Sequence, residues 1–228
     1  MGYKYEPHMH TGEGSACGRS SGAEMVNIYK EWGYSGVFVT DHFFNGNCAV
    51  DCRLPWAEKV ELFCKGYEKA KAEGDRIGLQ VFFGFEYGVR SADFLVYNLD
   101  KAWLLAHPDI DKWDPRKAFR TMRAEGGFIV HAHPFREREY IDHIQLYPRD
   151  IDGVEVFNGA QINDRFMNDR AKLYAMMYDL PQTAGTDSHS VEDAFRSGVE
   201  TEERLESALD YLEKMKAGQL KLLKTFRK

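Results

Sequence analysis

Short apolar runs alternate along the chain with longer segments whose apolar residues recur at helical spacing. Runs such as 79–85 are typical of buried strands, whereas 55–73 carries its apolar residues on one helical face. The expected strands are 3–5, 36–40, 79–85, 94–97, 128–130, 153–157, 181–184 and 220–223. The expected helices are 23–32, 55–73, 115–125, 165–178 and 201–216, the last with Thr201 as its N-cap. This alternation predicts an α/β fold with a parallel sheet.

Nearly every expected strand ends in a residue that can bind a metal ion. His8 and His10 are two residues apart, so on a strand both rings project to the same side. The later strands end in His42, Glu86, His131 with His133, and Asp187 with His189, and Asn158 is a further polar candidate. In an α/β barrel the C-terminal strand ends meet on one face. The sequence therefore predicts one metal site there.

Each of these residues also has an ordinary structural interpretation. A histidine at a strand end is usually a hydrogen-bonded core residue, Glu86 could form an ion pair, and Asp187 could cap a turn. The repetition of imidazole and carboxylate groups at successive strand ends favours the metal site over a series of unrelated structural roles.

The types of ligand indicate the metal and the chemistry. Imidazole and carboxylate without a required thiolate are typical of Zn, Mn or Fe. The candidates exceed what one tetrahedral ion uses, so we expect two or three divalent ions, with Glu86 as the bridge. Such clusters generate hydroxide near neutral pH and hold phosphoryl oxygens during displacement. Arg136 could steady the phosphate as a bidentate donor, or could be a surface residue of the charged run 136–139.

Length, composition and charge restrict the class of protein. The 228 residues fit one domain, 1–228, and 43% hydrophobic residues can build its core. A formal net charge of -6 argues against a generally basic nucleic-acid surface. No apolar run approaches the roughly 20 residues that span a bilayer, and no signal peptide is visible, so we expect a cytoplasmic protein without membrane contact. The cysteines, expected as unbridged thiols, are Cys17, Cys48, Cys52 and Cys64.

Five motifs in order resemble the polymerase and histidinol phosphatase (PHP) family of metal-dependent phosphoesterases. They are His8–Thr11, Thr40–His42, Gly84–Glu86, Ala132–Arg136 and Gly185–His189. The resemblance implies a distorted (β/α)₇, TIM-like barrel with a two- or three-metal centre that hydrolyses phosphate esters.

The resemblance also implies a ligand set. The first metal would be shared by His8, His10, Glu86 and Asp187, the second held by Glu86 and His133, and the third by His42 and His189. The loop after His10 would supply one more ligand, for which Glu13 is the candidate, and Asp41 would orient a neighbour or the bound water. The further histidine of several members is missing from 94–98, and His131 could replace it because residues two apart on a strand share a face.

The leading hypothesis is a phosphatase that hydrolyses a small phosphomonoester by attack of metal-bound hydroxide. Its expected catalytic residues are Asp41, Arg136 and Asp187, and its expected substrate-binding residues are Arg136 and Asn158. One alternative is a nucleotide phosphodiesterase or exonuclease. It needs a basic channel with stacking aromatics, of which only part is offered by Phe43, Phe44, Tyr87, Arg90 and Arg136. The other is a non-catalytic, metal-binding regulatory domain. Carbon–nitrogen bond hydrolysis is less favoured.

Overall fold

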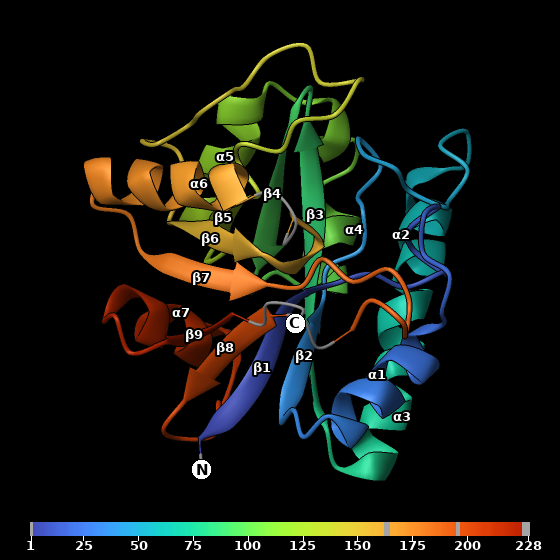
Figure 1. Cartoon of the computed structure of the whole chain (residues 1–228). Coiled ribbons are helices and arrows are strands. Elements are labelled where there is room, and N and C mark those ends of the chain that lie inside the picture. Colours follow the sequence, from blue (N-terminus) through green and yellow to red (C-terminus); the bar gives the residue numbers. More distant parts are fainter. Residues whose placement is uncertain (1, 162–164, 195–196, 225–228) are drawn as a thin grey trace.

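One mixed sheet organises the chain (Figure 1). The computed structural model describes residues 2–161, 165–194 and 197–224. The strands are β1 (Tyr3–Met9), β2 (Gly36–Val39), β3 (Gln80–Val89), β4 (Ala92–Tyr97), β5 (Phe128–Ala132), β6 (Gly153–Asn158), β7 (Gln182–Gly185), β8 (Ser197–Thr201) and β9 (Lys221–Lys224). Within the described ranges, they follow the order β7-β6-β5-β4-β3-β2-β1-β8-β9.

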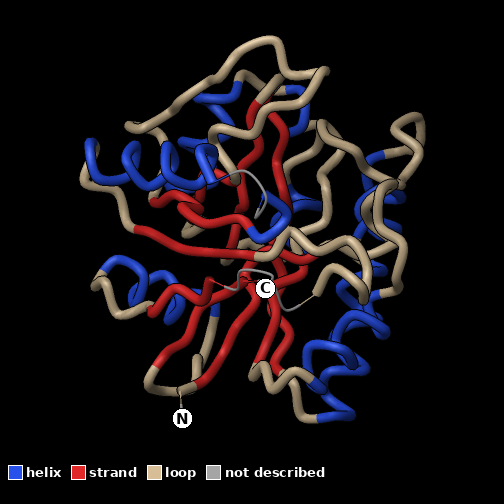
Figure 2. The backbone as a smooth tube through the Cα atoms, viewed as in Figure 1, coloured by secondary structure: helices blue, strands red, loops and turns tan. Residues whose placement is uncertain are grey.

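The sheet is parallel on both sides of one antiparallel strand. β1, β2 and β3 pair in parallel, as do β5, β6 and β7, and β4 runs antiparallel between β3 and β5. β8 and β9 continue beyond β1 as antiparallel strands. After β7 the chain returns to β1, where the Asp187 N–H donates to the His8 carbonyl at 3.0 Å and the His10 N–H to the Ser188 carbonyl at 2.9 Å. The sheet is therefore a nearly closed barrel (Figure 2).

Helices cover the outside of this sheet. They are α1 (Gly22–Glu31), α2 (Trp56–Phe63), α3 (Lys65–Ile77), α4 (Lys101–Ala106), α5 (Pro115–Ala124), α6 (Arg165–Met177) and α7 (Ala208–Lys216), with short 3₁₀ turns at Ile110–Lys112 and Gly159–Gln161. α1 and α3 pack together beside β2, and α6 lies over β6 (Figure 1). None of the described helices is long and apolar enough to cross a membrane.

Aromatic side chains fill the inside of the barrel. Tyr5, Phe38, Leu95 and Tyr97 come from three strands, β1, β2 and β4, and are fully buried in one apolar cluster. The Tyr97 hydroxyl donates to the Pro7 carbonyl at 2.9 Å, which satisfies its polar end inside the core. This packed layer fixes the relative positions of the strands and thus of the residues at their ends.

The predicted α/β, barrel-like fold is confirmed, but not as an exact (β/α)₇ repeat. β3 and β4 are joined by only Arg90 and Ser91, which is a hairpin connection, so β4 must run antiparallel. The positive φ of Arg90 (53°) makes this tight turn. The expected helix 201–216 is also shorter, because Thr201 ends β8 and Ser207 is the N-cap of α7.

Candidate metal centre

Seven of the predicted ligands converge where β1, β2, β3, β5 and β7 end. They form three overlapping groups, in each of which the candidate ligand atoms lie within 4.8 Å of one another. The groups are His8, His10 and Asp187; His8, Glu86 and His133; and His10, His42 and His189. Because His8, His10 and Glu86 are fully or almost fully buried, these groups meet in a place that bulk water hardly reaches.

Hydrogen bonds orient the rings of His8 and His10. His8 Nδ1 lies 3.0 Å from Glu155 Oε1, and a carboxylate only accepts, so this nitrogen carries the proton. His10 Nδ1 lies 3.0 Å from the Ser15 hydroxyl, which itself donates to Asp41 at 2.7 Å and therefore accepts from His10. The two Nε2 atoms face each other at 3.1 Å. In the neutral rings both Nε2 atoms are lone-pair ends, which is the arrangement of two ligands to one cation.

Asp41 holds the loop after β1 rather than pointing at the cluster. Its carboxylate accepts hydrogen bonds from the Thr11 N–H (2.6 Å), the Thr11 hydroxyl (2.7 Å) and the Ser15 hydroxyl (2.7 Å). Burial raises the pKa of Asp41 to about 6, although these donors oppose the rise. Gly14 and Gly66 pack so closely here that an added Cβ would collide with Asp41 or Thr11. Asp41 is thus a positioning residue for Ser15 and, through it, for His10.

Glu86 lies at the middle of the cluster. Its Oε1 is 3.2 Å from His133 Nε2 and 3.4 Å from His8 Nε2, and its Oε2 forms an ion pair with His42 Nδ1. Neither Glu86 Oε2 nor Asp187 Oδ1 accepts a geometrically sound hydrogen bond from any residue that the structure describes. Buried carboxylate oxygens without donors are costly unless a cation satisfies them, so the donor set fits divalent ions.

Left-handed backbone turns two of the candidates toward the cluster. His133 (φ 30°) follows directly on β5, Asp187 (φ 58°) lies two residues after β7, and neither is a glycine. The His133 N–H donates to Glu155 Oε2 at 3.0 Å, which holds the turn. Asn158 is buried and donates from Nδ2 to Glu155 Oε2 at 2.9 Å and to Asp187 Oδ2 at 3.4 Å. Such strained positions cost free energy and are concentrated at functional sites.

Burial and neighbouring charges together set the pKa values in the cluster. Burial and the like-charged His189 and His42 keep the pKa of His10 well below its usual range. Burial would raise the pKa of Glu86, but the His42 imidazole and its other histidine neighbours outweigh this and hold the pKa well below normal. The pKa of Asp187 is likewise lowered, chiefly by His8, against the effect of burial. Both carboxylates are therefore ionised and available to cations.

Three predicted site residues lie elsewhere. Glu13 accepts a hydrogen bond from the Gly22 N–H at the start of α1 and pairs with Lys69, both at 3.0 Å, so its carboxylate is turned away from the metal candidates. His131 does not share a face with His133, since the strand ends at Ala132 and φ of His133 is positive. Asn158 orients Glu155 and Asp187 from a buried position behind the site and does not line the cavity.

The ring of His131 lies in an apolar core. It stacks on Phe94 with 4.5 Å between ring centroids, and its edge contacts Tyr174. Neither ring nitrogen has a hydrogen-bond partner in the described part of the chain. Burial, with a contribution from His133, lowers the pKa of His131 to about 3, so the ring is neutral. The prediction that it completes the second metal site is wrong.

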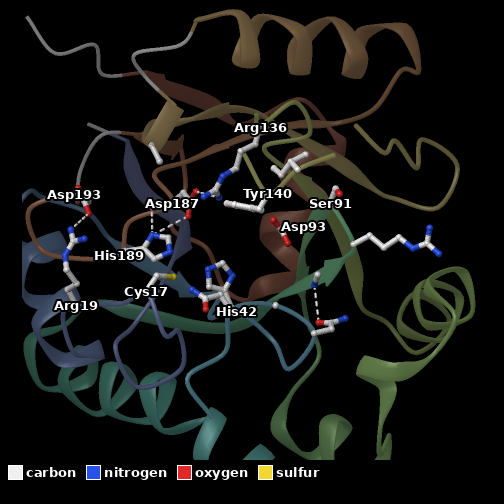
Figure 3. A pocket seen from close by; sticks show the side chains of 17 residues that line it. Cys17, Arg19, His42, Ser91, Asp93, Arg136, Tyr140, Asp187, His189 and Asp193 are labelled. Carbon is white, nitrogen blue, oxygen red and sulfur yellow. Dashed lines mark hydrogen bonds and ion pairs between the residues drawn. The ribbon is translucent and has the colours of Figure 1, made fainter. Parts of the chain in front are cut away.

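A cavity of about 600 Å³ opens over the cluster. His42, Asp187 and His189 form its floor, and Arg136 enters it with Nη1 3.7 Å from Asp187 Oδ2 (Figure 3). The remaining lining residues are Cys17, Arg19, Asn45, Gly46, Asn47, Gly88, Arg90, Ser91, Asp93, Tyr140, Ile141, Ala160 and Asp193.

Sequence reasoning did not assign Cys17 or Asp93 to the metal centre. The Cys17 thiol lies beside His189 and His42, and these neighbours lower its pKa to about 6 although burial opposes the change. Asp93 faces Glu86, and burial and that negative neighbour raise its pKa. Asp93 is the second residue of the antiparallel strand β4. It therefore lies outside the C-terminal strand ends on which the predicted ligand set was based. The four cysteines are free, as predicted.

Comparison with known proteins identifies the fold. No protein-family model and no curated protein matches the chain. A two-domain protein containing a predicted PHP-like metal-dependent phosphoesterase from Bacteroides vulgatus ATCC 8482 superimposes with a TM-score of 0.71 at 16% identity, over 99% of this chain and 65% of that protein. The chain thus spans about two thirds of that relative, and it has the fold of PHP-like metal-dependent phosphoesterases.

Two further solved structures show that this fold occurs with different activities. The endonuclease PfuEndoQ from Pyrococcus furiosus has a TM-score of 0.57 at 11% identity, over 97% of this chain and 58% of its own. An amidohydrolase from Chromobacterium violaceum, with bound sulfate and no metal, has a TM-score of 0.55 at 15% identity, over 96% and 97% of the two chains. The reaction must therefore be argued from the residues of the site.

Proposed function

We propose that this chain is a metal-dependent phosphoesterase of the PHP type that hydrolyses a small phosphomonoester. The observation that carries the proposal is the cluster of buried, donor-poor carboxylate oxygens and facing imidazole nitrogens at the strand ends. A protein core does not tolerate such a cluster without cations. The open cavity over it gives a substrate direct access.

The residues divide naturally among two or three ions. His8, His10 and Asp187 would hold one ion, Glu86 and His133 a second, and His42 and His189 a third, with Glu86 shared. Asp93 lines the cavity over the cluster and is the available carboxylate for the second position. Bound Zn, Mn or Fe would supply an activated water and positive charge beside the phosphoryl oxygens.

Arg136 is the proposed phosphate-binding residue. Its side chain is half-buried at the cavity wall, and its Nε has no hydrogen-bond partner among the described residues. The guanidinium enters the cavity beside Asp187, and its terminal N–H groups can donate to a phosphate oxygen that approaches the metals. The position of Arg136 supports an anionic substrate.

The shape of the cavity favours a small substrate over a nucleic-acid strand. Phe43 and Tyr87, which the nuclease alternative needs as stacking residues, are buried in the core, and Phe44 packs against Trp56. Tyr140 is the aromatic residue that lines the cavity among those described. A volume of about 600 Å³ lies in the range of small-molecule sites.

Phosphate release from a panel of phosphomonoesters tests this function. Protein loaded with Mn²⁺, Zn²⁺ or Fe²⁺ should release phosphate from at least one ester, and chelation should abolish the reaction. His10→Ala or Asp187→Ala should lose turnover with the fold intact, whereas His143→Ala, which removes an exposed histidine outside the cluster, should not. Retained turnover in His10→Ala would refute the proposal.

Two outcomes would support the alternatives. Hydrolysis of nucleotide diesters or single strands in preference to monoesters would identify a phosphodiesterase or nuclease. Metal binding without any turnover would indicate a regulatory, metal-binding role.

A further inference from the structure

The Cys17 thiol lies at the third metal position. It lines the cavity with His42 and His189, and Figure 3 shows its sulfur between the two rings. His10 stacks on His189 with 4.1 Å between centroids and approaches His42 at 4.3 Å. Ligand nitrogens of these three histidines lie within 4.8 Å of one another. The Cys17 sulfur thus lies beside two imidazoles of this group.

The loop that carries Cys17 is held on both sides of it. The Ala16 N–H donates to the Asn47 carbonyl at 2.9 Å, and the Gly18 N–H donates to the Ser15 carbonyl at 2.9 Å. The Arg19 N–H donates to the carbonyl of His189 itself at 2.7 Å. At Gly18 an added Cβ would collide with the Thr11 carbonyl, so the close approach of the loop requires glycine. The backbone therefore fixes Cys17 relative to His189.

We propose that Cys17 is a thiolate ligand of the third metal ion, together with His42 and His189. The inference rests on the proposed metal centre. Two imidazoles and one thiolate are donors that zinc sites use, and a site with three protein ligands keeps a position open for water or substrate. Glu13, which the loop would otherwise offer, is engaged by Gly22 and Lys69.

A thiolate changes which metal this position accepts. Soft sulfur ligands favour Zn²⁺, Fe²⁺ and Co²⁺, whereas Mn²⁺ and Mg²⁺ prefer oxygen. The third position should therefore retain zinc or iron in the presence of excess magnesium. Cys17→Asp should shift the preference at this position toward Mn²⁺, because it replaces sulfur with carboxylate oxygen.

Cobalt spectroscopy tests the ligand without relying on turnover. Metal-free wild-type protein titrated with Co²⁺ should develop a thiolate-to-cobalt charge-transfer band in the near ultraviolet, as well as visible d–d bands. Cys17→Ser and Cys17→His should lose the charge-transfer band and keep d–d bands, and Cys48→Ser should behave like the wild type. Zinc affinity of Cys17→Ser should fall at least about tenfold, since even the loss of outer-shell partners costs 10–100-fold.

The outcomes separate this inference from the proposed function. Visible d–d bands without a charge-transfer band in the wild type, or a band that persists in Cys17→Ser, would overturn the Cys17 assignment and leave the metal centre standing. Absence of any cobalt binding would overturn both.

Alkylation supplies a second readout that distinguishes a ligand from a nucleophile. Saturating zinc should protect Cys17 from iodoacetamide, while exposed Cys52 serves as the internal reference in peptide mass spectra. Equal labelling of Cys17 with and without zinc would contradict ligation.

Discussion

The Nε2 atoms of His8 and His10, two residues apart at the end of β1, lie 3.1 Å apart and face each other. Each ring is oriented by a partner on its Nδ1, Glu155 for His8 and Ser15 for His10. Asp187 Oδ1 lies 3.5 Å from the first Nε2 and 3.2 Å from the second. Three potential electron-pair donors are thus directed at one point. A cation bound at that point would satisfy all three, whereas without a cation their lone pairs would repel one another.

Glu155→Gln should weaken metal binding by about 10–100-fold, as is typical for partners that orient metal-binding histidines. Glu155 accepts from His8 Nδ1, from the His133 N–H and from Asn158, and the amide of glutamine would meet one of these donors with another donor. Chelator competition measures the affinity, and circular dichroism checks the fold. Unchanged affinity would show that Glu155 does not orient the ligands.

Asp41→Asn should also lower metal affinity, because it weakens the contacts that place Ser15 against His10. A positioning residue and a catalytic acid or base differ in a measurable way. If Asp41 only positions, kcat at saturating metal should largely recover. If Asp41 transfers a proton, kcat should stay low at every metal concentration while metal affinity remains normal.

Arg136→Ala should lower kcat/KM for the phosphomonoester by about 10–100-fold, the value of one lost hydrogen bond to a charged group. The main effect should be on KM if Arg136 binds phosphate before the reaction. Arg138→Ala is the matched control, because Arg138 is exposed in the same loop and does not line the cavity. Equal effects of the two substitutions would argue against a phosphate-binding role.

The buried carboxyl of Glu6 should make the metal-free protein less stable at alkaline pH. Burial raises its pKa from 4.5 to about 7, although it accepts hydrogen bonds from the backbone N–H groups of Thr186 and His8. Between these pH values the folded protein binds a proton that the unfolded chain has lost. The stabilisation that comes from the protonated Glu6 carboxyl is therefore complete below pH 4.5 and is lost as the pH rises through about 7. The loss is on the order of 3 kcal/mol.

Urea unfolding at pH 5 and pH 8 checks this expectation in chelated wild-type protein and in Glu6→Gln. The amide keeps one oxygen for both N–H donors and does not ionise. The stability difference between the two pH values should therefore shrink in the variant. The same difference in both proteins would rule out Glu6 as its source.

His131→Leu should leave metal affinity unchanged and alter the free energy of unfolding at pH 7.5 by no more than about 1 kcal/mol. The wild-type ring leaves both nitrogens without partners in the described structure, so an apolar side chain loses no hydrogen bond there. The pKa of His131 is lowered to about 3 in the folded protein, so on acidification the unfolded chain binds the proton first and the folded wild type loses stability. Leucine cannot bind a proton, so the free energy of unfolding of the variant should fall less in acid. A large loss of metal affinity would restore His131 as a ligand.

The strand-end ligands could be predicted because a local pattern carries them. Apolar runs mark the strands, the C-terminal ends of parallel strands meet at one face, and His42, Glu86 and Asp187 lie within or just after such runs. The alternation of side chains also places His8 and His10 together. These relationships depend on neighbouring residues only.

The remaining parts of the site depend on tertiary contacts that no local pattern reports. Cys17 and Glu13 share one loop, and only its hydrogen bonds to Asn47 and His189 decide which side chain enters the cavity. His131 was misassigned because the positive φ of His133 breaks the alternation of the strand. Asp93 reaches the cavity because the β3–β4 hairpin makes β4 antiparallel, so that the start of β4, and not its end, lies beside the site.

Metal analysis of protein purified by gel filtration tests the central claim most directly. Inductively coupled plasma mass spectrometry of protein reconstituted with zinc should find two or three ions per chain, with fewer in Asp187→Ala and an unchanged number in His143→Ala. Less than one ion per chain in the wild type, or equal content in wild type and Asp187→Ala, would contradict a metal centre at the strand ends.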